Sequence, residues 1–83
     1  MVIMGYKTLD RFQPGETGTI DLIQTPNYKV RQRLLEMGLT KGSRLEVIRF
    51  APMGDPIEIT VRGYHLSLRI EEAKTITLLS AAG

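Results

Sequence analysis

Short stretches in which apolar and polar residues alternate recur along this chain, separated by turn residues. The stretches cover residues 18–22, 45–50, 57–61, 66–70 and 76–78. In the first of them, alternation places Ile20 and Leu22 on the same face. Turns rich in glycine and proline come between them, at intervals typical of a small all-β fold. The pattern predicts five short strands.

The segment between the first two strands has a helical period instead. Its apolar residues lie three and four positions apart and form one stripe: Val30, Leu34 and Met37. Asn27 precedes them as a helix N-cap, because its side-chain oxygen can accept a hydrogen bond from a free backbone N–H. Gly38 follows where a helix ends in a left-handed conformation, and Leu39 can then fold back onto the last turn. We predict a short helix from Tyr28 to Met37.

The remaining connections are predicted to be loops and turns. Residues 51–56 form a loop that two prolines stiffen. Arg62-Gly63 is a tight turn between the third and fourth strands, and Leu66, Leu68 and Ile70 then alternate in the fourth. Residues 71–74 form a polar turn before the last strand.

The predicted fold class is all-β with one short inserted helix. Five short strands expose fewer edges when the sheet closes into a small barrel. An SH3-like barrel is the first choice and an OB-fold the second. The whole chain, residues 1–83, is predicted to be a single domain with its core at about 9–79.

Composition adds constraints on the class of protein. Hydrophobic residues make up 42% of the chain and charged residues 24%, an ordinary globular balance. No run approaches the ~18 apolar residues of a membrane helix, and the apolar start, residues 1–6, is too short for a signal peptide. We therefore expect a cytoplasmic protein. The chain has no cysteine, so it has neither disulfides nor thiolate metal ligands.

The sequence offers no arrangement of residues that points to catalysis or to a cofactor. A P-loop pattern is missing, and the G-x-x-G at residues 15–18 precedes a strand, where it is a turn and not a nucleic-acid clamp. His65 is the single histidine, without the converging ligands that Fe²⁺ requires. We predict no catalytic, cofactor-binding or metal-binding residues, and no enzyme activity.

Several segments together resemble the FeoA family. Residues 31–39 (RQRLLEMGL) are similar to its arginine-leucine and Met-Gly-Leu signature. Lys41-Gly42, which precedes a predicted strand, is similar to the segment that follows this signature in the family. Three further segments resemble its opening PGE-x-G-x-I, its AP-x-GDP loop and its G-x-x-LALR strand: residues 14–20, 51–56 and 63–69. Ser67 stands where the family usually has alanine. The resemblance extends from about Leu9 to Leu78.

This resemblance implies an SH3-like barrel and a non-catalytic bacterial protein of ferrous iron uptake. It implies a partner, a membrane Fe²⁺ permease with its own GTPase domain (FeoB-type), which the protein would bind and modulate. Association with the membrane would be indirect, through that partner, and self-association is left open. The same barrel ends iron-dependent repressors, so a free-standing regulatory domain of that kind is an alternative.

The predicted helix carries the sequence's main candidate for a partner surface. Lys29 and Arg33 are like charges one turn apart, an arrangement that a helix disfavours. Two explanations are open: these side chains belong to a face that solvent covers, or they belong to a surface that docks a partner. Aromatic, apolar and arginine side chains together are typical of interface centres. The candidate partner-binding residues are Tyr28, Arg31, Leu35, Met53 and Asp55.

A nucleic-acid-binding barrel is the rival interpretation. The formal net charge is only +2 despite a pI near 9.2, whereas such proteins usually carry a dense basic stripe. The five aromatic residues are spread over different elements, although base stacking needs them on one face: Tyr6, Phe12, Tyr28, Phe50 and Tyr64. We therefore expect no nucleic-acid partner.

Overall fold

The computed structural model of the chain describes residues 4–81, which form one antiparallel sheet and short helical segments. The strands are β1 (Met4–Thr8), β2 (Thr17–Ile23), β3 (Arg44–Phe50), β4 (Ile57–Val61), β5 (Tyr64–Leu68) and β6 (Ile76–Ala81). The helical segments are the 3-10 helix η1 (Leu9–Arg11) and the α-helices α1 (Tyr28–Glu36) and α2 (Ile70–Ala73). The predicted mostly β fold with an inserted helix is confirmed, with six strands in place of five.

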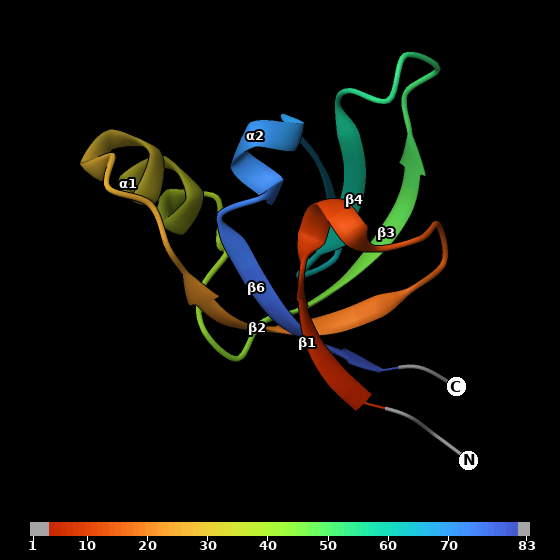
Figure 1. The fold of residues 1–83 in the computed structure, drawn as a ribbon, viewed down its shortest axis with the longest axis horizontal. Helices are drawn as coiled ribbons and strands as arrows, with labels where there is room; N and C mark the ends of the chain where they lie inside the picture. Colours follow the sequence, from red (N-terminus) through yellow and green to blue (C-terminus); the bar gives the residue numbers. More distant parts are fainter. Residues whose placement is uncertain (1–3, 82–83) are drawn as a thin grey trace.

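The strands follow the order β1-β6-β2-β3-β4-β5 across the sheet. The sheet is strongly curved, α1 extends from one side of it, and α2 lies beside η1 near one end (Figure 1). Within residues 4–81, β1 and β5 stand at the two ends of this order and do not pair with each other. Each of these two strands therefore leaves one edge without a strand partner.

The opening of the described chain was missed by the sequence prediction. β1 pairs with β6 over residues 4–8, and η1 then buries Leu9 completely. Phe12, just after η1, is only 1% exposed. The segment was missed because its apolar and polar residues do not alternate clearly. Its pairing partner, β6, also lies far away in the sequence.

A bulge corrects the predicted face of Leu22. The register of β2 against β6 shifts between Ile20 and Leu22. A bulge adds one residue to a strand and turns the side chains that follow it. Ile20 and Ile23 are therefore buried, whereas Leu22 is 43% exposed.

The segment after β5 is helical, so the predicted strand residue Ile70 and the predicted polar turn were wrong. Ile70 begins α2 and packs against the core only partly. The carboxylate of Glu72 accepts a hydrogen bond at 3.0 Å from the backbone N–H of Arg69, the residue before the helix. Ala73 is fully buried. A glutamate at this position satisfies an N–H that the helix leaves free, which favours a helical turn.

The ends of α1 are as predicted, apart from Met37, which caps the helix instead of belonging to it. The Asn27 side chain accepts hydrogen bonds from the N–H groups of the first turn, at 3.0 and 3.3 Å. Gly38 has a φ of 88°, which glycine adopts without a steric penalty. Leu39 then folds back, and its N–H donates to the carbonyl of Leu34 at 3.1 Å.

The core fills the concave side of the sheet and reaches under α1 and α2. Leu34 is the residue of α1 that is fully buried, and Val30 and Met37 pack against the core from its rim. The buried hydrophobic residues are Leu9, Phe12, Ile20, Ile23, Leu34, Leu39, Leu45, Val47, Ile57, Ile59, Val61, Leu68, Ala73, Ile76 and Leu78. Burying one such aliphatic side chain contributes roughly 1.5–3 kcal/mol, so the barrel holds without disulfides.

Candidate partner-binding surfaces

An ion pair holds α1 against α2. Arg33 donates to the carboxylate of Glu72. The Glu72 side chain is 7% exposed and that of Arg33 55% exposed. A carboxylate this deeply buried needs a charged or hydrogen-bonded partner. Arg33 therefore has a structural role, although its side chain stays on the exposed face of α1.

The C-terminal end of α1 is capped by the turn between β4 and β5 and by the residue that follows it. Arg62 in that turn donates to the carbonyl of Gly38 at 3.3 Å and to the hydroxyl of Ser43 at 2.9 Å. The hydroxyl of Tyr64 donates to the carbonyl of Met37 at 3.2 Å. A cation near the last carbonyls also interacts favourably with the helix dipole. The turn thus fixes where α1 ends.

Of the three predicted residues on the flank of α1 (Tyr28, Arg31 and Leu35), Arg31 and Leu35 lie beside β2. Arg31 donates to the carbonyl of Ile23 at 2.8 Å, so its side chain is held across the gap between α1 and the sheet. Tyr28 is 72% exposed and Leu35 37% exposed. Arg31 and Leu35 line a groove of about 190 Å³ together with residues of β2, including Leu22.

The predicted residues of the β3–β4 loop lie elsewhere. Met53 is 91% exposed. Asp55 accepts a hydrogen bond at 3.1 Å from the N–H of Ile70, so it supports the start of α2. It lines a second cavity of about 310 Å³ with Arg33 and Arg69. The structure therefore brings Arg33, not Arg31, next to Asp55, and the five predicted residues divide between two places.

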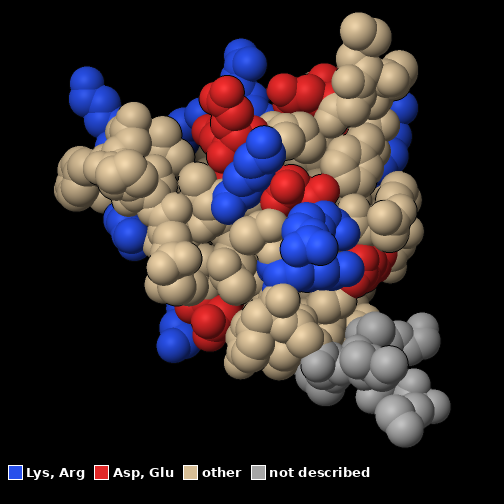
Figure 2. Space-filling view, in the orientation of Figure 1, with Lys and Arg blue, Asp and Glu red and all other residues tan. Residues whose placement is uncertain are grey.

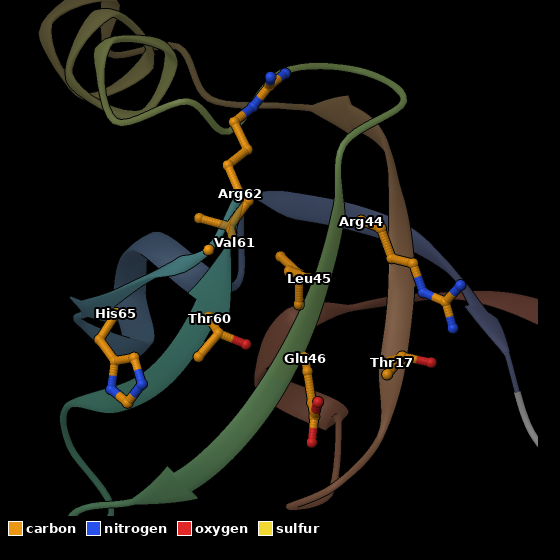
Figure 3. A pocket seen from close by; sticks show the side chains of 9 residues that line it. Thr17, Arg44, Leu45, Glu46, Thr60, Val61, Arg62 and His65 are labelled. Carbon is orange, nitrogen blue, oxygen red and sulfur yellow. The ribbon is translucent and has the colours of Figure 1, made fainter.

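A shallow groove of about 420 Å³ lies on the outer side of the sheet. Thr17, Glu46, Thr60 and His65 come one after another across β2, β3, β4 and β5 (Figure 3). His65 thus faces threonine and glutamate, not further histidines. Within residues 4–81 there is no group of three histidine, cysteine or acidic side chains that could hold a metal ion.

Charged side chains also organise the face shown in Figure 2. Basic side chains lie near its centre, over β1 and η1, with acidic side chains beside them (Figure 2). Glu16, just before β2, connects β1 with β6. Its carboxylate pairs with Lys7 of β1 at 2.7 Å, accepts the N–H of Gln13 at 2.9 Å, and accepts the hydroxyl of Ser80 of β6. Burial raises the pKa of Glu16, but the bonds from Lys7, Ser80 and Gln13 outweigh it and lower the pKa below its ordinary value.

Two residues that organise these surfaces were missed from the sequence. Glu72 follows Arg69 by three positions, which is the spacing of a helix capping residue, and this signal could have revealed α2. Arg62 has a positive φ of 51°, and its contacts with Gly38, at the end of α1, and with Ser43, just before β3, span 24 and 19 positions in the sequence. No local pattern reports such a contact.

Comparison with known proteins identifies the family. The sequence model of the FeoA domain matches residues 7–78. The chain belongs to the FeoA family. A curated relative, the Fe(2+) transport protein A/Fe(2+) transporter FeoB fusion protein of Porphyromonas gingivalis, is 41% identical over 46 residues, which are 55% of this chain and 6% of the relative. The chain thus spans only a small part of that relative's length.

Solved FeoA structures have the same fold. The FeoA protein from Chlorobium tepidum is 38% identical and has a TM-score of 0.81, with 87% of this chain and 68% of that chain covered. Stenotrophomonas maltophilia FeoA, solved in complex with zinc and described as a procaryotic SH3 domain protein, is 25% identical with a TM-score of 0.76. That match covers 87% of this chain and 88% of the other. The predicted SH3-like fold is confirmed.

The structure explains part of the FeoA resemblance. Gly38, in the Met-Gly-Leu segment, lies under the turn at β4–β5, and an added Cβ would come within 3.0 Å of the Tyr64 hydroxyl. Asp55, in the Gly-Asp-Pro loop, holds the first turn of α2. Both positions serve the fold. No helix in the described part of the chain is long and apolar enough to cross a membrane.

Proposed function

We propose that this chain is a non-catalytic accessory protein of ferrous iron uptake, which binds and modulates a membrane Fe²⁺ permease of the FeoB type. The observation that carries the proposal is the relative in which Fe(2+) transport protein A and the transporter FeoB form one polypeptide. Two proteins that are fused in one organism usually act together when they are separate in another. The permease carries its own GTPase domain, so this chain would act on it from the cytoplasm.

A binding role, not a chemical one, is supported by the surface. The concavities described above are open and of mixed polarity, whereas sites for small substrates are usually enclosed and largely apolar. Arg31 and Arg33 each hold α1 in place, through the carbonyl of Ile23 and the carboxylate of Glu72, and the sequence has no P-loop pattern. We therefore propose that the chain itself hydrolyses no nucleotide.

We propose the flank of α1 as the primary contact with the permease. Tyr28 and Leu35 expose apolar surface beside Arg31, a combination that is enriched at energetically important interface positions. Arg31 is held in place by its bond to Ile23, so little side-chain entropy remains to be lost on binding. Met53 and Asp55 would then belong to a separate, secondary contact.

The test is co-purification from the native host. The tagged chain is expressed there, the membranes are solubilised in detergent, and the amount of co-purified permease is measured. Wild-type protein should retain the permease, and Leu35→Asp should reduce the amount several-fold. Arg44→Glu, a change at an exposed position of β3 on the outer side of the sheet, is the control and should leave it unchanged. Equal recovery with a folded Leu35→Asp variant would exclude the α1 flank, and a wild type that retains no permease would contradict the function.

A further inference from the structure

The free edge of β5 has its hydrogen-bonding groups exposed. β5 joins β4 through the two-residue turn Arg62-Gly63, in which both residues have positive φ values of 51° and 84°. In such a hairpin the pair next to the turn, Val61 and Tyr64, is hydrogen-bonded, and the pairs alternate from there. The N–H and C=O groups of Tyr64, Leu66 and Leu68 therefore point to β4. Those of His65 and Ser67 point away from the sheet.

No strand of the described chain covers these outward groups, because β5 ends the strand order. His65 and Ser67 are exposed, and Leu66 between them is only partly buried against the core. Natural proteins usually protect such an edge with a charge, a proline or a covering segment. β5 has no proline, lysine, arginine or acidic residue. An extended segment added here would gain backbone hydrogen bonds and cover the rest of Leu66.

A cavity lined by two arginines and one aspartate lies at the far end of the same edge. Ser67 and Arg69 line it together with Arg33, Asp55 and Pro56, and its volume is about 310 Å³. The carboxylate of Asp55 is already bonded to the N–H of Ile70. Arg33 uses one nitrogen for Glu72 but stays 55% exposed. Arg69 is exposed, and its guanidinium has no ion pair in residues 4–81. The guanidinium of Arg69 and the remaining nitrogens of Arg33 can therefore bind a further carboxylate, even though Asp55 contributes one negative charge to the same lining.

We propose that the β5 edge binds an extended segment of the partner protein as an added strand, with an acidic side chain of that segment entering the cavity between Arg33 and Arg69. The inference deepens the proposed function and rests on it for the source of the segment, which is the FeoB-type permease. The backbone bonds to β5 supply affinity. The acidic side chain fixes the register of the added strand, because carboxylates form directional paired hydrogen bonds with arginine.

A second copy of this chain is a poorer occupant of the edge. From Arg62 to Arg69 the chain has an arginine at each end and no acidic residue. Antiparallel pairing of two β5 strands would bring the Arg69 of each copy towards the basic turn of the other, and like charges at close range destabilise such a pair. An acidic segment would instead be attracted to the arginines at both ends of β5 and would stabilise the pairing.

The experiment measures binding of the purified chain to the detergent-solubilised permease with two matched pairs of variants. Ser67→Pro removes the outward N–H of β5, and proline is tolerated at such edge positions; Ser67→Ala keeps the N–H. Arg69→Glu reverses a charge in the cavity, and Arg44→Glu makes the same change on β3. We expect Ser67→Pro and Arg69→Glu each to raise the Kd about tenfold or more, Ser67→Ala to raise it far less than Ser67→Pro, and Arg44→Glu to change it less than about twofold.

Hydrogen exchange by mass spectrometry provides the second readout. Backbone amides in peptides covering residues 64–69 should exchange more slowly when the permease is bound, whereas those of β3 should be unchanged. If Ser67→Pro fails to fold, Arg69→Glu and this protection decide the question. Normal permease binding by folded Arg69→Glu, with no protection at β5, would overturn the inference and leave the proposed function intact. Concentration-dependent self-association that protects β5 would also overturn it. If the wild-type chain does not bind the permease at all, both this inference and the proposed function are contradicted.

Discussion

The exposed guanidinium of Arg33 on α1 is paired with the buried carboxylate of Glu72 on α2, although 39 positions separate the two residues in the sequence. The same carboxylate accepts the backbone N–H of Arg69. One side chain therefore closes the turn after β5 and fastens the inserted helix to the barrel. Because α1 carries the proposed contact with the permease, this ion pair sets the position of that contact.

Removal of Arg33 should destabilise the fold. Arg33→Ala leaves the Glu72 carboxylate buried without its charged partner, which we expect to lower the free energy of unfolding by about 1–3 kcal/mol. Half of the Arg33 side chain is exposed, so the loss should lie below that of a fully buried pair. Denaturant unfolding measures it. Gln32→Ala, at the neighbouring exposed position of α1, is the control, and an equal effect of both changes would contradict this role.

At Arg62, two substitutions can separate the destabilisation caused by the backbone conformation from the stabilisation provided by the side chain. Both Arg62→Ala and Arg62→Gly remove the bonds to the end of α1. Only glycine relieves the cost of a φ of 51°. We expect Arg62→Ala to be less stable than wild type by about 1–3 kcal/mol, and Arg62→Gly to recover about 1 kcal/mol of that loss. Thermal unfolding of the three proteins tests the order, and an alanine variant as stable as the glycine variant would refute it.

A methyl group at residue 18 should disturb the core. A Cβ added to Gly18 would lie 2.8 Å from two ring carbons of Phe12 and 3.2 Å from the carbonyl oxygen of Leu79. Overpacking of this kind typically costs about 1–3 kcal/mol, so Gly18→Ala should unfold at a lower denaturant concentration. Gly5→Ala is the matched control, because nothing lies within 4 Å of its Cβ. If both variants unfold together, the packing of Phe12 against β2 is not as described.

Acid should release the stabilisation provided by Glu16. Its pKa is lowered in the folded protein, so its contribution is complete above the ordinary glutamate pKa of about 4.3. The contribution is lost as the pH falls through the lower folded-state pKa. The stability difference between wild type and Glu16→Gln should therefore be largest near neutral pH and shrink in that acidic range. Glu46→Gln, at an exposed position of β3, controls for the loss of one negative charge; a Glu16→Gln difference that is constant from neutral to acidic pH would contradict the assignment.

Local patterns were sufficient for the elements whose signals are local. Asn27 and Gly38 marked the two ends of α1, and alternation located most of β3 and β4. The bulge that exposes Leu22 could not be seen, because it depends on the register against β6. β1 was missed for a similar reason, since its pairing spans almost the whole chain.

For the candidate partner-binding residues, too, the sequence indicated local features but not contacts between distant segments. The sequence selected Tyr28 and Leu35 as candidate contact residues of the helix, and their side chains are 72% and 37% exposed. It could not show that Arg31 is held by β2 or that Asp55 supports α2. Those contacts join different elements of the folded chain, so they cannot be inferred from the residues next to them in the sequence. The roles of these residues in partner binding stay predictions.

The central claim, that this chain works by binding the permease, is tested most directly by titrating it into purified FeoB-type permease in lipid nanodiscs. We predict saturable binding that weakens in Arg31→Glu, most strongly at low salt, where electrostatic attraction is least screened. Thermal unfolding must first show that the variant is folded, because Arg31 also holds α1 to β2. Absence of saturable binding by the folded wild-type chain would contradict the account.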